Sequence, residues 1–235
     1  MRKVGERLLE LIYPPRCAVC GELLTMEERE GFLCGDCRKV PYLAAEKCPH
    51  CGGSTEGGFC EACLKEFACS RVWAAFSYET VRDAIHLFKY EGDQRIGKGL
   101  GRLMGIYLRQ REPFSAERAE VLLAVPLHWK KENRRGFNQT HILCEEIAAE
   151  TGIPFQREGL VRKWDTAAQS TLSHAERREN LRDAFSVTED FQGKRVLLVD
   201  DIFTTGTTCN ECARELYRAG AAEVMVFALA AAGQQ

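Results

Sequence analysis

The sequence lacks any apolar run of about 18 residues, the length that a membrane-spanning helix requires, so no membrane span is expected. It also lacks an excess of charge of one sign, because 32 Lys and Arg residues face 34 Asp and Glu residues. Nucleic-acid binding would therefore depend on a local patch rather than on net charge. Glu6 and Glu10 interrupt the apolar stretch near the start, and no small-residue cleavage site follows it. A secretory signal is thus not expected, and the sequence predicts a cytoplasmic location.

Cysteine is the residue type in clear excess, with 12 in 235 residues. Eight of them form four C-x-x-C pairs between residues 17 and 63. One such pair presents two thiolates to an ion, and a second pair completes a tetrahedral shell, so the pattern predicts two zinc ions. Four thiolates leave no open coordination position, which makes a structural role the expected one. The predicted ligands are Cys17, Cys20, Cys34, Cys37, Cys48, Cys51, Cys60 and Cys63.

The pairing of these ligands has more than one solution from sequence alone. In the sequential pairing, the first two C-x-x-C pairs share one ion and the last two share the other. In a crossed pairing, the first and third pairs share an ion. His50 lies inside the third pair and is an alternative to a cysteine ligand. Residues 1–71 carry no excess of basic side chains, which favours a structural or partner-docking role for this module over nucleic-acid binding.

The composition changes near residue 70, so we expect an N-terminal helix and zinc-ribbon module in residues 1–70 and a second domain in residues 71–235. In the second domain, short apolar runs alternate with helical patterns. The runs at 72–78, 121–125, 196–199 and 223–229 predict strands, and the segments 80–91, 96–111, 138–151 and 208–220 predict helices. Apolar strands alternating with helices predict an α/β fold with a parallel sheet flanked by helices.

The segment 195–208 contains the most informative motif of the chain. A predicted buried strand ends at Asp200 and Asp201, and a loop of small residues leads into a helix. Backbone N–H groups, Thr hydroxyls and the start of a helix together suit a phosphate group. The carboxylates would repel a phosphate and instead suit sugar hydroxyls or a divalent cation. The candidate phosphate-binding residues are Thr204, Thr205, Gly206, Thr207 and Thr208.

A nucleotide-binding P-loop is excluded because its Lys is missing, and residues 196–208 resemble the signature of type I phosphoribosyltransferases instead. The segments 14–21, 88–93, 125–139 and 160–185 extend this resemblance over nearly the whole chain, to the ComF family. That resemblance implies a double zinc ribbon before a type I phosphoribosyltransferase-like domain, and a link to DNA uptake in competent bacteria. It also implies that Asp200 and Asp201 hold the ribose hydroxyls of phosphoribosyl pyrophosphate, with Mg²⁺.

Phosphoribosyl transfer releases pyrophosphate, so its site also needs cations near a strand end. The segment 125–139 follows a predicted strand and offers the cations Lys130, Lys131, Arg134 and Arg135. The resemblance implies that this segment includes the loop that binds pyrophosphate. A solvated basic turn is the alternative for this segment. By analogy with the family, residues 162–182 would form a flap over the substrate, and Lys89 and Tyr90 are candidates to reach the same cleft. Among the histidines, His128 is the candidate general base, because it lies beside the proposed pyrophosphate loop.

Two functions remain open from the sequence. The first is a Mg²⁺-dependent phosphoribosyltransferase whose acceptor is unknown. The second is a non-catalytic accessory protein that binds phosphoribosyl pyrophosphate and contacts single-stranded DNA or a competence helicase. Cys209 and Cys212 form a fifth C-x-x-C pair at the start of a predicted helix, where a lowered thiol pKa would allow redox chemistry. Packing against the sheet is the expected role of these two cysteines.

Overall fold

The protein is seen in a computed structural model that describes residues 14–17, 19–29, 33–37, 48, 51, 55, 58–110, 119–127, 130, 132–133, 136–163 and 184–232. Within these residues, no helix has both the length and the apolar character needed to cross a membrane.

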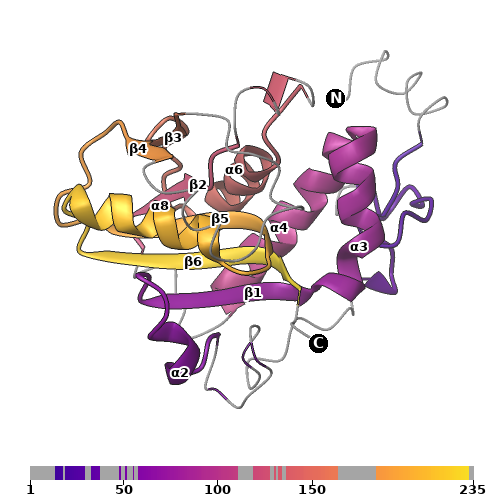
Figure 1. Ribbon diagram of the computed structural model, residues 1–235. Helices are drawn as coiled ribbons and strands as arrows, with labels where there is room; N and C mark the ends of the chain where they lie inside the picture. Colours follow the sequence, from indigo (N-terminus) through magenta and orange to yellow (C-terminus); the bar gives the residue numbers. More distant parts are fainter. Residues whose placement is uncertain are drawn as a thin grey trace.

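A four-stranded parallel sheet forms the centre of the molecule, with the strand order β1-β6-β5-β2 (Figure 1). Its strands are nearly continuous apolar runs, as expected of a sheet that is covered on both faces. The predicted α/β fold class is therefore confirmed. The strands are β1 (Arg71–Ser77), β2 (Val121–Ala124), β5 (Arg195–Phe203) and β6 (Glu223–Ala231).

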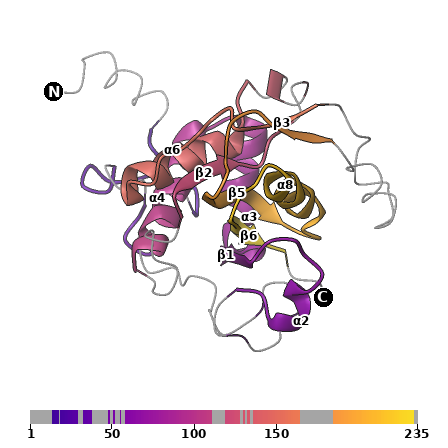
Figure 2. The ribbon, with the colours of Figure 1, turned by 90° about the vertical axis from the view of Figure 1, so that its left-hand side faces the viewer.

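Helices cover both faces of the sheet (Figure 2). Helices α4 and α6 lie on one side of the strands, and α8 lies on the other. Side chains alternate between the two faces along each strand, so Phe227 packs in the cluster with α4 while Val226 packs in the cluster with α8. The helices are α3 (Tyr78–His86), α4 (Gln94–Gln110), α6 (Gln139–Thr151) and α8 (Thr207–Arg218).

The two halves of the cysteine-rich module pack on different faces of this domain. Cys17, Val19 and Leu24 belong to the apolar cluster that contains α3 and α4. Phe59 and Cys63, at the short helix α2 (Glu61–Leu64), belong to the cluster that contains α8. Figure 1 shows α2 below the strand β1, away from α3.

The structure differs from the sequence-based expectation at three places. Strand β5 continues past the two aspartates to Phe203, because its backbone keeps pairing with β6 as far as Ala231. The predicted helix 80–91 is instead α3 followed by a single π-helical turn, η2 (Leu87–Glu91). A small antiparallel pair, β3 (Leu160–Arg162) and β4 (Phe185–Val187), was not predicted.

Candidate functional site

The eight cysteines of the C-x-x-C pairs form two clusters, Cys17/Cys20/Cys34/Cys37 and Cys48/Cys51/Cys60/Cys63. In each cluster the four sulfur atoms lie within 4.8 Å of one another. Four sulfurs bound to zinc at about 2.3 Å with tetrahedral angles would lie about 3.8 Å apart. The Sγ–Sγ distances are 3.7 Å for Cys20–Cys34 and 3.7 Å for Cys51–Cys60. The donor set and spacing therefore fit structural zinc.

The clusters pair in sequence order, so the crossed pairing considered above is wrong. Both clusters repeat one burial pattern, in which the first and last cysteine are buried and the second is exposed. Each of the two similar ribbons thus offers one four-cysteine site. His50 lies outside the described residues.

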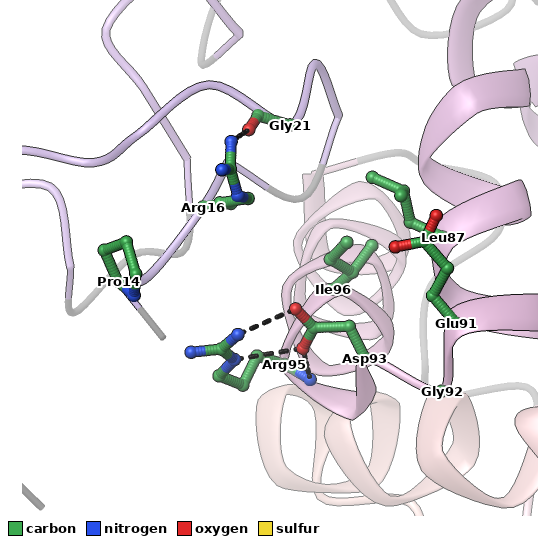
Figure 3. A pocket seen from close by; sticks show the side chains of 9 residues that line it. All are labelled: Pro14, Arg16, Gly21, Leu87, Glu91, Gly92, Asp93, Arg95 and Ile96. Atoms are coloured by element: carbon green, nitrogen blue, oxygen red, sulfur yellow. Dashed lines mark hydrogen bonds and ion pairs between the residues drawn. The ribbon is translucent and has the colours of Figure 1, made fainter. Parts of the chain in front are cut away.

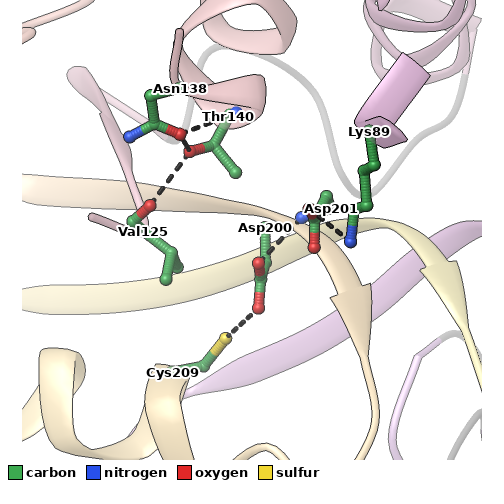
Figure 4. A network of polar contacts seen from close by, with 7 residues as sticks. All are labelled: Lys89, Val125, Asn138, Thr140, Asp200, Asp201 and Cys209. Atoms are coloured by element: carbon green, nitrogen blue, oxygen red, sulfur yellow. Dashed lines mark hydrogen bonds and ion pairs between the residues drawn. The ribbon is translucent and has the colours of Figure 1, made fainter. Parts of the chain in front are cut away.

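Asp200 and Asp201 lie near the carboxyl end of β5, the edge of a parallel sheet at which ligands bind. Adjacent strand residues point to opposite faces, and the two carboxylates do so here (Figure 4). Asp200 accepts a hydrogen bond from the Cys209 thiol on α8, with a sulfur–oxygen distance of 3.2 Å. Asp201 pairs with Lys89 on η2, with a nitrogen–oxygen distance of 2.6 Å. The acidic pair is therefore held from both sides of the sheet.

Burial, and then the adjacent charge of Asp201, raise the pKa of Asp200 to about 7. The hydrogen bonds from Cys209 and from the Asp201 amide, and the charge of Lys89, act in the opposite direction. Asp200 therefore changes charge near neutral pH.

Burial raises the pKa of the Cys209 and Cys212 thiols well above the ordinary value. Burial outweighs the lowering of a thiol pKa that a helix N-terminus would cause, because both side chains pack in the apolar cluster beneath α8. The redox interpretation of this C-x-x-C pair is therefore not supported, and Cys209 acts as a thiol donor to Asp200.

Lys89 reaches the acidic pair because of the π-helical turn that carries it. Such turns occur often at functional sites, since the extra residue redirects the side chains around it. The turn ends at Gly92, and Phe88 within it is fully buried and stacks on Phe137 with a ring-centroid distance of 5.7 Å. Tyr90 is exposed and packs its ring on His86 instead.

The loop after β5 is short, since α8 begins at Thr207. Thr207 and Thr208 are thus the first residues of the helix rather than part of the loop. Gly206 is the N-cap residue, with φ of 69°, a left-handed conformation that favours glycine. The Thr205 and Thr207 hydroxyl oxygens are 2.9 Å apart. The amide groups of a helix N-terminus therefore lie directly beyond the acidic pair, an arrangement that attracts anions.

The segment predicted to bind pyrophosphate starts at the same edge of the sheet, where the Val125 amide donates to the Val199 carbonyl oxygen at 2.8 Å. Lys130 is exposed, whereas Lys131, Arg134, Arg135 and His128 lie outside the described residues. Asn138 caps α6 by accepting a hydrogen bond from the Thr140 amide at 3.1 Å. Residues 164–182 of the predicted flap also lie outside the described residues.

A cavity of about 640 Å³ lies where the first ribbon meets η2 and α4 (Figure 3). The Arg95 guanidinium donates to both Asp93 carboxylate oxygens on its wall, and Arg16 donates to the Gly21 carbonyl oxygen. Both arginines that line the cavity thus donate hydrogen bonds to other residues of its wall.

The fold is that of a phosphoribosyltransferase-type α/β domain with an N-terminal double zinc ribbon. Residues 134–235 match the phosphoribosyl transferase domain, and residues 8–64 match the double zinc ribbon domain. The chain is 32% identical over 212 residues to Competence protein F of Haemophilus influenzae, covering 85% of this chain and 90% of that protein. It is also 32% identical over 224 residues to the DNA utilization protein YhgH of Escherichia coli K12, covering 93% of this chain and 98% of that protein. The chain belongs to the ComF family.

Proposed function

We propose that this protein binds phosphoribosyl pyrophosphate with Mg²⁺ at the carboxyl end of β5 and acts as a phosphoribosyltransferase. The observation that carries the proposal is the juxtaposition of Asp200 and Asp201 with the N-terminus of α8. Carboxylates accept hydrogen bonds from ribose hydroxyls, and helix amides donate to a 5′-phosphate. In this proposal Thr204, Thr205, Gly206, Thr207 and Thr208 hold the phosphate.

The negative charge of the leaving group requires cations elsewhere in the site. Pyrophosphate must be stabilised as it departs, and Lys130, Lys131, Arg134 and Arg135 are the proposed cations. Mg²⁺ is a hard cation that would neutralise pyrophosphate oxygens and orient the ribose hydroxyls. Lys89 pairs with Asp201 at a nitrogen–oxygen distance of 2.6 Å and only 13% of its side chain is exposed, so it holds Asp201 in place beside the proposed ligand.

The biological setting is proposed from the relatives. One is named a competence protein and another a DNA utilization protein. We propose that this chain acts in the same setting, in the cytoplasm, with a zinc-ribbon module in residues 1–70 and the phosphoribosyltransferase-type domain in residues 71–235.

Calorimetry with phosphoribosyl pyrophosphate, with and without Mg²⁺, tests the binding step. We expect Mg²⁺-dependent binding that Asp201→Asn weakens at least about tenfold, a loss of about 1.4 kcal/mol. Asp190→Asn is the matched control, because Asp190 is an exposed carboxylate that precedes β5 and thus lies at the opposite edge of the sheet. Unchanged affinity in the Asp201 variant would refute the proposed site.

The second candidate is an accessory protein that binds the ligand without turning it over and contacts single-stranded DNA or a competence helicase. The names of the relatives, a competence protein and a DNA utilization protein, support this second candidate. Measuring pyrophosphate release in the presence of each free nucleobase separates the two functions, because only an enzyme releases it. For DNA contact, reversing the charge of Lys130 and Lys131 should abolish a salt-sensitive binding of single strands.

A further inference from the structure

Three phenylalanine rings join the second zinc ribbon to the end of β5. The Phe59 and Phe203 ring centroids are 5.0 Å apart at an interplanar angle of 85°, and those of Phe59 and Phe67 are 5.4 Å apart at 73°. Edge-to-face pairs of this kind are favourable beyond the area that they bury. Phe59 directly precedes the zinc ligand Cys60, and Phe67 follows the zinc ligand Cys63 by four residues. The second ribbon therefore contributes two of the three rings.

These rings press directly on the turn that starts α8. A Cβ atom added to Gly206 would lie 2.2 Å from the Phe203 ring and 2.4 Å from the Phe67 ring. Such distances mean that both rings touch the Gly206 backbone and leave no room for any other side chain. A residue of the zinc ribbon thus packs directly against Gly206, the N-cap residue of α8.

A separate hydrogen bond ties the same two regions together. The Ala68 amide donates to the Asn210 side-chain oxygen at 2.7 Å, across 142 residues of sequence. Asn210 lies in the first turn of α8 and is only 5% exposed. Its own amide donates to the Gly206 carbonyl oxygen at 2.8 Å, which closes that first turn.

The first ribbon has a different environment, since its buried residues pack with α3 and α4 rather than with α8. The two zinc sites have the same ligands and burial pattern, but the second ribbon, rather than the first, packs beside the start of α8.

We infer that Phe67 of the second zinc ribbon is a positioning residue for the phosphate-binding turn, so that an intact second zinc site raises the affinity of this turn for a phosphate ester. The inference rests on the proposed function for its ligand. It adds that the zinc ribbon shapes the site itself, through the ring contact on Gly206 and the Ala68–Asn210 hydrogen bond.

The variant Phe67→Ala tests the ring contact. We expect two bound zinc ions as in the wild type, faster hydrogen exchange at the amides of residues 206–210, and affinity for phosphoribosyl pyrophosphate lowered about tenfold. Phe67→Leu should restore most of both properties, because it returns an apolar side chain to the same space. Lys65→Ala is the matched control in the same ribbon, because the exposed Lys65 side chain forms an ion pair with the exposed Glu61. Wild-type exchange and affinity in Phe67→Ala would overturn the inference.

A comparison of the two zinc sites tests whether the second site supports the phosphate-binding turn more than the first does. Cys20 and Cys51 are the exposed members of their clusters and occupy the same place in each C-x-x-C pair. Each Cys→Ser variant should lose one zinc ion, but Cys51→Ser should accelerate exchange at residues 206–210 and weaken binding more than Cys20→Ser. Equal effects would overturn the inference. If the wild type fails to bind phosphoribosyl pyrophosphate, the proposed function fails, while a selective exchange effect still supports the positioning role.

Discussion

At the scale of single residues, the acidic pair shows how neighbours in sequence acquire different surroundings. Asp200 lies against the Cys209 thiol beneath α8, and Asp201 lies against the Lys89 ammonium group on the other face. The cation stabilises the charge of Asp201, whereas burial and that same charge oppose ionisation of Asp200. A carboxyl group whose pKa lies near neutral pH, beside a specific charged partner at a strand end, is typical of functional sites.

The raised pKa of Asp200 predicts a pH dependence of stability. The folded chain binds this proton up to a pH of about 7, whereas the unfolded chain releases it near the ordinary value of 3.8. Between these values the folded state binds more protons, so this group lowers the free energy of unfolding as pH rises. We expect Asp200→Asn to be more stable than the wild type at pH 8 and to lose that advantage towards pH 5. Urea unfolding at several pH values measures the difference.

The comparison isolates Asp200, because both chains carry the same zinc sites. Asp83→Asn, which removes an exposed carboxylate on α3, is the control variant. A stability difference between Asp200→Asn and wild type that stays constant with pH would contradict the prediction.

At the scale of elements, the π-helical turn η2 brings Lys89 to Asp201. Its Phe88 ring fills the space beside Gly97 of α4, where an added Cβ would lie 2.3 Å from the ring. The turn η2 can approach α4 this closely because Gly97 has no side chain. The stack of Phe88 on Phe137 extends the contact to the segment 125–139.

Gly97→Ala should therefore displace Phe88 and the turn that carries it. Overpacking of this kind costs about 1–3 kcal/mol of stability, which urea unfolding measures. We also expect weaker binding of phosphoribosyl pyrophosphate, since Lys89 shifts with the turn. Lys98→Ala, an exposed neighbour on the same helix, is the control and should leave both properties near those of the wild type. An equally stable Gly97 variant would show that the turn adjusts freely.

At the scale of the whole molecule, the two ribbons attach to opposite faces of one sheet. Each is a short segment with little apolar core of its own, which metal binding makes stable. The cysteines outside the ribbons lie in the core instead: Cys144 and Cys212 are fully buried, and Cys69 and Cys209 nearly so.

Metal analysis of the purified protein should therefore find two zinc ions per chain, one for each four-cysteine cluster. Cys144→Ser should keep both ions, because its thiol is buried in the cluster that contains α4 and α6. A chelator that removes zinc should lower the unfolding temperature, since the bound metal stabilises the folded state. A single zinc ion in the wild type would contradict the sequential clusters.

The sequence by itself determined the fold class, the main strands and helices, the cysteine ligands and the acidic pair with its Thr-rich turn. These features are local, since residue spacing and apolar periodicity encode them within short segments. Only the tertiary structure decided the zinc pairing, the length of β5, the π-helical turn, the partners of Asp200 and Asp201, and the contact of Phe67 with Gly206. Each of these depends on atoms from segments far apart in the chain, such as the 142 residues between Ala68 and Asn210. Packing brings such segments together, and no local pattern records which surfaces will meet.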